Sequence, residues 1–460
     1  MRILFVIPDL PQTPFTGAHT RPLTMLTAAA RRHEIFAVGA APPGSDFGAL
    51  NDLCSELDWV TLDEARPLTR RVLAGGRRVL TPVPLLSRGR SQAIAGLVAR
   101  AAARHKPDAL FVETMYAIHY RQPGIRTIAD LLDVVSGLCE SAAAARPLRY
   151  AAAGMQAISA RRKERELLRD VVPVTINDAD RGRLANVGVS AFTVPLAVSL
   201  PAEIGRSSGD DREGGSGGEA GAGLEAYAGR VARRRPAGAP VRLLFVGSYL
   251  HAPNEEAARY LVRRLAPALR HAGMAFELTL AGRAAPAWLL ERASEDIKVL
   301  SDVDDLAALY RQADIVLAPL AHGGGTKNKT LEAMAWGLPV LGTPQAFTGL
   351  GALDGEAFVC TSLETDDMVA DLRRLAADPG LRAHLGAAGR KYVAEAHTED
   401  LAEARAVALF DAVAFGGGVP EAEALWRNRR DSLEPQSAGA ADSPPPRHRS
   451  AHTGNDAAAS

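Results

Sequence analysis

Short apolar segments alternate with longer helix-forming segments along most of the chain, and this alternation is the strongest constraint on its fold. In the first 200 residues the expected strands are 2–7, 34–38, 59–62, 109–113, 127–130 and 172–176. Stretches of helical composition separate them, most clearly at 19–32, 92–104, 148–168 and 178–184. Strands that alternate with helices predict a parallel sheet covered by helices on both faces.

The alternation stops near residue 203 and returns at 241. Further strands are expected at 241–247, 277–281, 297–300, 315–319 and 339–341, with helices at 255–270, 306–311, 330–336 and from 365 to about 415. The segment in between is rich in Gly, Ser, Glu and Arg, with too few large apolar residues to offset the entropy of ordering it. We predict an α/β chain with an N-terminal Rossmann-like domain at 1–202, a flexible linker or insertion at 203–240, a C-terminal Rossmann-like domain at 241–415 and a disordered tail at 416–460.

Composition excludes several classes of function. Lys plus Arg and Asp plus Glu both number 53, so the basic excess of a nucleic-acid-binding protein is absent. The three cysteines, Cys54, Cys139 and Cys360, are far apart and have no CxxC spacing, which argues against a disulfide framework or a zinc site and fits the cytoplasm. The first apolar run is interrupted by Asp9 and predicts a strand, not a signal peptide. No stretch is long and apolar enough for a transmembrane helix.

One stretch is strongly basic. From Arg66 to Pro107 the sequence contains no acidic residue and ten basic ones, ending at Lys106. Apolar residues lie between the arginines, so the stretch Arg66 to Lys106 could contact an anionic membrane at its inner face. The other interpretation is a solvated arginine-rich face of a chain biased toward Ala and Arg. Both interpretations stay open.

The segment 315–340 carries the clearest functional signal. An expected strand ends at Leu320, Gly323, Gly324 and Gly325 follow, and a helix begins near Asn328. Ligands of open α/β sheets bind beyond the carboxyl ends of the strands. Consecutive glycines let the backbone approach a ligand and offer N–H groups to anionic oxygens, and the helix N-terminus adds partial positive charge.

Two lysines strengthen this prediction. Lys327 and Lys329 are two of only six lysines in the chain, and ammonium groups beside a glycine turn suit a diphosphate. The segment matches neither the GxxxxGK[ST] nor the GxGxxG pattern. The alternative is a tight turn with solvated lysines. Glu332, early in the helix, either accepts hydrogen bonds from ribose hydroxyls or complements the helix dipole.

Several motifs resemble the donor domain of family-4 retaining glycosyltransferases of the GT-B fold, in particular the exopolysaccharide-type sugar transferases with a GxGxKxKxLEAMA segment. They are residues 304–306, 313–319, 323–335 and 337–340, with 245–249 and 252–254 at the opening and Thr343, 348–350 and 378–379 at the close. The resemblance is strong over 241–400 and weaker over 1–200.

The resemblance implies two Rossmann-like domains facing a central cleft, a nucleoside-diphosphate sugar as donor, no metal or other cofactor, and transfer with retention to a hydroxyl of an unidentified acceptor. The donor-binding residues that it implies are Gly247, Ser248, Asn254, Arg283, Gly323, Gly324, Gly325, Thr326, Lys327, Asn328, Lys329 and Glu332.

The sequence departs from the family pattern in two places. The family has two glutamates separated by seven residues; Glu332 matches the second, but Gly324 occupies the first, which normally touches the donor sugar. The family also has an arginine after the glycine of the first donor-domain strand, where this chain has Ser248, so Lys327 or Lys329 must supply the charge. Arg283 either helps with this or is a surface arginine on a turn.

The N-terminal half offers weaker signals for the acceptor side. Gly17 and Arg21 resemble the glycine-rich turn that opens the family's first helix, although an ordinary helix start fits equally well. The catalytic candidates are Glu113, Asp133 and Lys327. Glu113 or Asp133 would position the acceptor hydroxyl or take its proton, unless each is only a polar residue at a strand end. Lys327 would stabilise the leaving diphosphate.

These observations predict a retaining glycosyltransferase. Two alternatives remain: a non-catalytic GT-B relative that binds a nucleotide-sugar, suggested by Gly324, and a sugar-nucleotide epimerase on the same fold. We expect the protein in the cytoplasm, with or without peripheral contact to the membrane.

Overall fold

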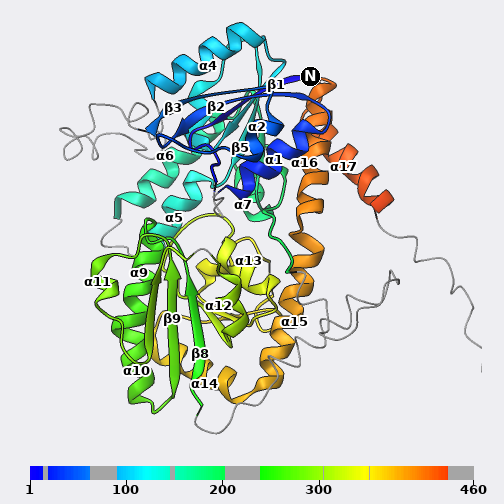
Figure 1. Cartoon of the computed structure of the whole chain (residues 1–460). Helices are drawn as coiled ribbons and strands as arrows, with labels where there is room; N and C mark the ends of the chain where they lie inside the picture. The colour runs from blue at the N-terminus through cyan, green and yellow to red at the C-terminus, as the bar shows by residue number, and fades with distance from the viewer. Residues whose placement is uncertain are drawn as a thin grey trace, which may run out of the picture.

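The computed structural model describes residues 1–13, 19–62, 91–145, 151–201, 239–303, 305–351 and 353–433. These residues form two α/β domains, one above the other in Figure 1. Most of the predicted linker and the end of the predicted tail, from residue 434 onward, lie outside the described residues, so the predictions for these two segments remain untested.

The N-terminal domain contains a seven-stranded parallel sheet with the order β3-β2-β1-β4-β5-β6-β7. Its strands are β1 Arg2–Ile7, β2 Glu34–Ala41, β3 Glu56–Thr61, β4 Ala109–Glu113, β5 Arg126–Leu131, β6 Val171–Thr175 and β7 Phe192–Thr193. Successive residues of β1 enter different cores: Ile3, Phe5 and Ile7 pack on one face of the sheet, and Leu4 and Val6 on the other. A strand that is apolar on both faces is expected when helices cover both sides.

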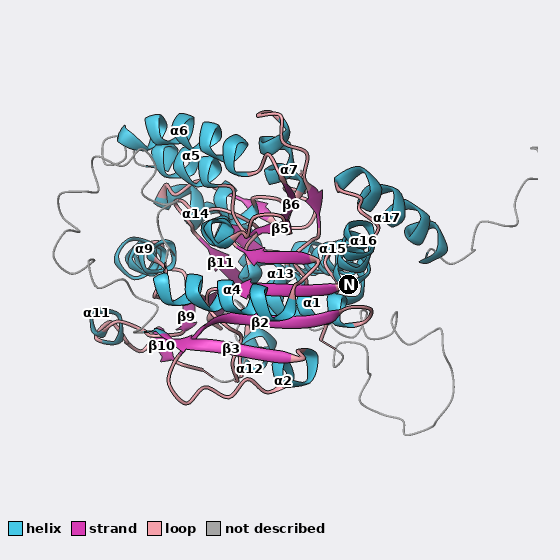
Figure 2. Ribbon diagram, turned by 90° about the horizontal axis from the view of Figure 1, so that it is seen from above, coloured by secondary structure: helices cyan, strands magenta, loops and turns pink. Residues whose placement is uncertain are grey.

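Helices cover both faces of this sheet. They are α1 Thr20–Ala30, α2 Ala49–Leu53, α4 Gln92–His105, α5 Val135–Ala145, α6 Ala151–Leu167 and α7 Asp178–Ala185, with a 3₁₀ helix, η3, at Met115–Tyr120. Figure 2 shows β2 and β3 side by side, with α5 and α6 packed against each other at the other end of the sheet, on the side of β5 and β6. The sequence did not predict α5, which lies next to the site described below.

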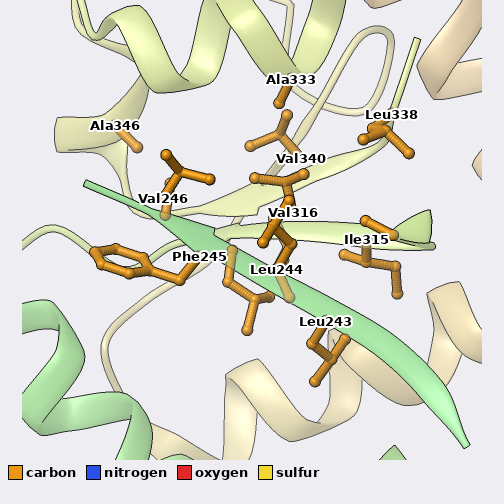
Figure 3. Packing of buried hydrophobic residues seen from close by; sticks show 14 of the residues in the cluster. Leu243, Leu244, Phe245, Val246, Ile315, Val316, Ala333, Leu338, Val340 and Ala346 are labelled. Atoms are coloured by element: carbon orange, nitrogen blue, oxygen red, sulfur yellow. The ribbon is translucent and has the colours of Figure 1, made fainter. Parts of the chain in front are cut away.

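The C-terminal domain contains a six-stranded parallel sheet with the order β10-β9-β8-β11-β12-β13. Its strands are β8 Val241–Val246, β9 Phe276–Gly282, β10 Ile297–Ser301, β11 Ile315–Ala318, β12 Val340–Gly342 and β13 Val359–Cys360. Its helices are α9 Ala252–Tyr260, α10 Ala266–His271, α11 Ala287–Leu290, α12 Ala307–Gln312, α13 Asn328–Ala335, α14 Thr365–Ala377 and α15 Pro379–Ala396, with a π-helix, η5, at Leu261–Leu265 and a 3₁₀ helix, η6, at Pro344–Phe347. Leu244, Val316 and Val340, from three neighbouring strands, pack together in its core (Figure 3).

Both sheets have the same change of direction in their strand order. The chain moves outward from β1 through β2 to β3 and then returns to the other side of β1 with β4; β8 and β11 repeat this arrangement. Helices that leave two such neighbouring strands cover opposite faces, which opens a crevice at the carboxyl ends of the strands. The site should therefore lie beyond the ends of β1 and β4 in one domain and of β8 and β11 in the other.

The C-terminal helices correct the predicted domain boundary. Helix α16, Glu399–Ala414, belongs to the core of the N-terminal domain, where Phe410 lies 6.0 Å from the rings of both Phe5 and Phe111. Figure 1 shows α15 and α16 running from the lower domain to the upper one. The prediction that residues up to 415 belong to the second domain is therefore wrong for α16.

The predicted disorder from residue 416 onward is also wrong for the next helix, α17, Val419–Leu433. Val419, Ala422 and Trp426 are three and four residues apart, so they form one apolar stripe, and all three are buried against the N-terminal core. Arg405 of α16 lies over the ring of Trp426 at 4.9 Å. The physical reason is tertiary packing: a short polar helix becomes stable when its single apolar stripe has a partner.

Within the described residues, no helix is long and apolar enough to cross a membrane.

Replacing Phe410 with Ala tests the role of α16. Phe410 is fully buried in the N-terminal core, so its loss should lower the free energy of unfolding by about 3–5 kcal/mol. Phe415, at the end of the same helix, is 86% exposed, and Phe415→Ala should change it by less than about 0.5 kcal/mol. Urea unfolding followed by circular dichroism measures both; equal effects of the two variants would contradict this packing.

Candidate functional site

The glycine turn, Gly323–Gly325, follows the buried strand β11 and leads into α13. Gly323 has φ 142° and Gly325 has φ 59°, values that residues with a side chain rarely adopt. The turn can therefore take this path only because both positions are glycine. Lys327 occupies the N-cap position of α13, as expected for a turn that opens a helix.

The glycine turn packs directly against the N-terminal domain. A β-carbon on Gly324 would lie 2.5 Å from Oδ1 of Asp133 and closer still to the side chain of Leu138. A β-carbon on Gly325 would lie 2.7 Å from the same Asp133 oxygen. Both distances are shorter than real contacts. At Gly324 the atoms in the way belong to the side chains of Leu138 and Asp133, whereas at Gly325 the Leu132 carbonyl would also lie 2.9 Å away, so a side chain there would displace backbone of the N-terminal domain.

Three hydrogen bonds join the turn to α5 and η6 in a closed ring. The amide of Gly323 donates to Oγ of Ser141 at 3.2 Å, and this hydroxyl donates to Oε1 of Gln345 at 2.7 Å. Nε2 of Gln345 donates back to the Gly323 carbonyl at 2.5 Å. Nearby, Nδ2 of Asn177 donates to Oγ1 of Thr326 at 3.3 Å, which adds a further bond between the domains. The sequence analysis missed Ser141, Gln345 and Asn177 because only the fold brings them to the turn.

Both lysines of the segment are at the site, and both are partly buried. Nζ of Lys327 donates to the carbonyls of Gly324 and Gly325, the latter at 2.6 Å. Burial lowers the pKa of Lys327 to about 8, although Asp133 and Asp180 oppose this. Burial and the charge of Lys327 lower the pKa of Lys329 to about 7. Two poorly solvated ammonium groups beside each other favour an anion, which would raise the pKa of both.

The end of β8 forms the neighbouring wall. Nζ of Lys329 donates to Oδ1 of Asn254 and lies 4.7 Å from the ring of Phe245. Nδ2 of Asn254 donates to the carbonyl of Ser248 at 2.8 Å, and Gly247 leaves the space that the Lys329 ammonium and Asn254 fill. The structure thus brings four predicted donor-side residues together: Gly247, Ser248, Asn254 and Lys329.

Glu332 and Asn328 are on α13, and one carboxylate oxygen of Glu332 already accepts a hydrogen bond. The hydroxyl of Tyr310 donates to Oε2 of Glu332 at 3.0 Å. Burial raises the pKa of Glu332, while the Tyr310 hydrogen bond and Lys329 lower it. A ribose would have to use the remaining acceptor capacity of this carboxylate. Asn328 is the first residue of α13, next to the lysines.

Arg283, just after β9, is exposed, and its charge acts on two residues of the N-terminal domain. Its charge lowers the pKa of both Asp9 and His19, although burial raises that of Asp9 overall. Arg283 is thus next to residues that the sequence analysis did not select. Asp9 was detectable from the sequence, because it follows the end of β1 at the edge where ligands bind.

The N-terminal side of the site is rich in carboxyl groups. Glu113, the last residue of β4, is only 6% exposed, and burial together with Asp130 and Asp9 raises its pKa to about 8 despite Arg21. Asp133 lies two residues beyond β5, and burial raises its pKa to about 6, with Lys327 opposing the shift. At neutral pH Glu113 is therefore mostly protonated, and its carboxyl carries an O–H that can act as a hydrogen-bond donor.

Arg21 has a different environment from the one predicted. Its guanidinium donates two hydrogen bonds to Asp130, at 2.7 and 3.0 Å, and another to the Val194 carbonyl at 2.7 Å. The side chains of Arg21 and Asp130 are almost fully buried. Arg21 thus joins α1 to β5 inside the domain, which does not favour direct contact with an acceptor. Gly17, the other predicted acceptor-side residue, lies outside the described residues.

Other sites have less support. In the part of the chain that the structure describes, no group of three or more His, Cys, Asp or Glu side chains is arranged to hold a metal ion. A surface cavity of about 480 Å³ is lined by Arg126, Arg165 and Arg169, among others. Because Arg126 begins β5, this cavity lies at the opposite edge of the sheet from the glycine turn.

Comparisons with known proteins agree with this arrangement. Sucrose-phosphate synthase from Thermosynechococcus elongatus aligns over 94% of this chain and 100% of its own, with a TM-score of 0.62 and 14% identity. WaaG, a glycosyltransferase involved in lipopolysaccharide biosynthesis, aligns over 88% of this chain and 98% of its own, with a TM-score of 0.57 and 17% identity. HepE from Anabaena, solved with UDP and glucose, aligns over 88% and 97%, with a TM-score of 0.53 and 13% identity. The chain has the GT-B fold.

The sequence of the second GT-B domain carries a further similarity. Residues 240–378, which include the glycine turn and both lysines, match the family model of glycosyl transferases group 1. No protein of curated function matches the chain. The fold and the domain match together support a GT-B glycosyltransferase.

The pH dependence of stability tests the environment of Glu113. The carboxyl is ionised above about pH 4.5 in the unfolded chain but only above about pH 8 in the folded one, so the folded state binds more protons in this interval and loses stability as the pH rises. Glu113→Gln removes this loss. Relative to wild type, the variant should gain on the order of 3 kcal/mol between pH 5 and pH 9.

Denaturant unfolding of both proteins at pH 5, 7 and 9 measures this gain. Asp52→Asn, at an exposed position on α2, is the control and should follow wild type at every pH. A Glu113→Gln difference that does not change with pH would contradict the raised pKa.

Proposed function

We propose that the protein is a retaining, metal-independent glycosyltransferase of family 4 that transfers a sugar from a nucleoside diphosphate to a hydroxyl of an acceptor. The observation that carries this proposal is the group of two partly buried lysines around the glycine turn, inside the segment that matches glycosyl transferases group 1. The description of HepE, with UDP and with UDP-glucose, is consistent with such a donor in a similar fold.

The lysines would act on the leaving group. As the bond between sugar and diphosphate breaks, negative charge grows on the diphosphate, and Lys327 and Lys329 oppose it from fixed positions in a poorly solvated site. Nζ of Lys327 donates to the carbonyls of Gly324 and Gly325, so this ammonium must turn from them toward the phosphates to act on the leaving group. No metal ion is required in this scheme because the ammonium groups provide the positive charge.

The carboxyl groups of the N-terminal domain would face the acceptor. Glu113 is at the end of β4 and Asp133 follows β5, so both lie at the edge of the sheet that meets the donor turn. We assign the positioning of the acceptor hydroxyl and the uptake of its proton to Glu113, while Asp133 lies directly against the donor turn. The acceptor attacks the anomeric carbon from the face that the diphosphate leaves, which retains the configuration.

A second candidate is a nucleotide-sugar-binding protein that transfers nothing. The observation that favours it is the closed ring of Gly323, Ser141 and Gln345, which occupies an amide of the donor turn. A screen of sugar and lipid acceptors that follows release of nucleoside diphosphate distinguishes the two: release that depends on an acceptor identifies the enzyme.

Lys327→Ala tests the donor site directly. Because an ammonium that contacts a diphosphate contributes more than a neutral hydrogen bond, its loss should weaken nucleoside-diphosphate binding about tenfold to a hundredfold. Isothermal titration with UDP, GDP, ADP and TDP measures this. The control is Lys391→Ala, since Lys391 is 74% exposed on α15, far from the turn in sequence. Equal binding by Lys327→Ala and wild type would refute the proposed site.

Peripheral membrane contact through Arg66 to Lys106 remains a prediction. Residues 66–90 lie outside the described residues, and of the remainder Arg104 forms an ion pair with Glu56. If the stretch binds lipid, the protein should float with anionic vesicles at low salt and separate from them at about 0.5 M salt, where charge interactions are screened. Equal flotation with neutral vesicles would show that the basic stretch is not responsible.

A further inference from the structure

The side chain of Asp133 points at the glycine turn of the other domain. Its Oδ1 lies 2.5 and 2.7 Å from the positions that β-carbons on Gly324 and Gly325 would take, so the carboxylate fills the space above both glycines. Among the residues that the structure describes, none donates a hydrogen bond to this carboxylate, although burial has already raised its pKa. A partly buried carboxylate without donors is costly unless a ligand supplies them.

The polar groups around Asp133 form their hydrogen bonds with other partners. Nζ of Lys327 attracts Asp133 but donates to the glycine carbonyls, and the amide of Gly323 donates to Ser141. The charge of Asp180 raises the pKa of Asp133, and the carboxylate of Asp180 accepts hydrogen bonds from Asn177 and Arg183. None of these neighbouring groups donates to Asp133, so its oxygens can accept hydrogen bonds from a molecule bound at the turn.

The position of Asp133 indicates which part of that molecule is involved. If the glycine turn and Lys327 hold a diphosphate, the group attached to its terminal phosphate must lie within a few ångströms of them. A carboxylate has two oxygens and can accept from two neighbouring hydroxyls, which a sugar ring offers and a phosphate does not. Asp133 also comes from the opposite domain, so it can reach this group only while the domains are in contact.

We propose that Asp133 binds hydroxyl groups of the transferred sugar and thereby determines which donor sugar the protein accepts. The proposal rests on the proposed function, because it requires the diphosphate at the glycine turn. Glycine at 324 is part of the arrangement: any side chain there would occupy the space that Asp133 fills.

Asp133→Asn separates sugar recognition from nucleotide binding. The amide keeps the size of the side chain but loses the charge and one acceptor, so binding of the nucleotide-sugar should weaken about tenfold or more. Binding of the same nucleoside diphosphate without a sugar should change by no more than about twofold. Isothermal titration uses matched probes: UDP with UDP-glucose, GDP with GDP-mannose, ADP with ADP-glucose, and TDP with TDP-glucose.

Two variants serve as controls. Asp52→Asn changes an exposed aspartate on α2 and should bind both probes as wild type does. The double variant Asp133→Gly, Gly324→Glu moves the carboxylate to the other wall of the same space, where only the flexible end of Leu138 must turn aside. It should regain part of the affinity that depends on the sugar. Thermal melting confirms that each variant is folded.

The outcomes distinguish this proposal from the proposed function. A selective loss of nucleotide-sugar affinity in Asp133→Asn supports the assignment. Equal losses for both probes, or no loss for either, overturn it while the donor site stands. If wild type binds none of the eight probes, the proposed donor site fails, and the role of Asp133 fails with it.

Discussion

The contact between the glycine turn and the loop after β5 is the interaction on which the site depends. Neither domain alone forms the site: the second provides the turn and the lysines, and the first provides Asp133 and Ser141. Two glycines permit this contact for different reasons. Gly325 adopts a positive φ, and Gly324 has no β-carbon in the space that Asp133 occupies. The identity of these residues thus sets how closely the two sheets approach at their carboxyl ends.

The two sides of this contact carry opposite kinds of ionisable group: lysines in the second domain and carboxyl groups in the first. On the side of the second domain, burial lowers the pKa of Lys327 and Lys329, and on the side of the first it raises the pKa of Glu113 and Asp133. Each group is destabilised in its charged form because water is partly excluded. An anionic ligand beside the lysines would stabilise their charged form, and hydroxyl groups beside the carboxylates would stabilise theirs. The interface therefore suits a molecule with an anionic part joined to a hydroxyl-rich part.

Local patterns in the sequence predicted the parallel sheets and the glycine turn, because apolar runs and consecutive glycines are local signals. They did not predict the partners of those elements. The family resemblance assigned Arg21 to the acceptor side and the local sequence fitted an ordinary helix start equally well; its partner Asp130 is 109 residues away, and only the packing of α1 on β5 reveals it. Ser141 has no distinctive sequence signal and matters only because α5 passes the turn. The stripe of α17 was too short to predict a helix before the core that receives it was known.

The chain passes between the domains around residues 196–198 and again around His397, and these two segments are hydrogen-bonded to each other. The backbone amide of Val198 donates to the His397 carbonyl at 2.9 Å, and Nδ1 of His397 lies 2.8 Å from the Leu196 carbonyl. Beyond this point α16 is part of the N-terminal core, so a rotation of one domain against the other would bend the chain near these residues. The direct bonds identified at the turn are few and mostly neutral, each contributing about 1 kcal/mol. Breaking these bonds therefore adds only a few kcal/mol to the cost of separating the turn from α5, a difference that a ligand with unequal affinity for the open and closed states can offset.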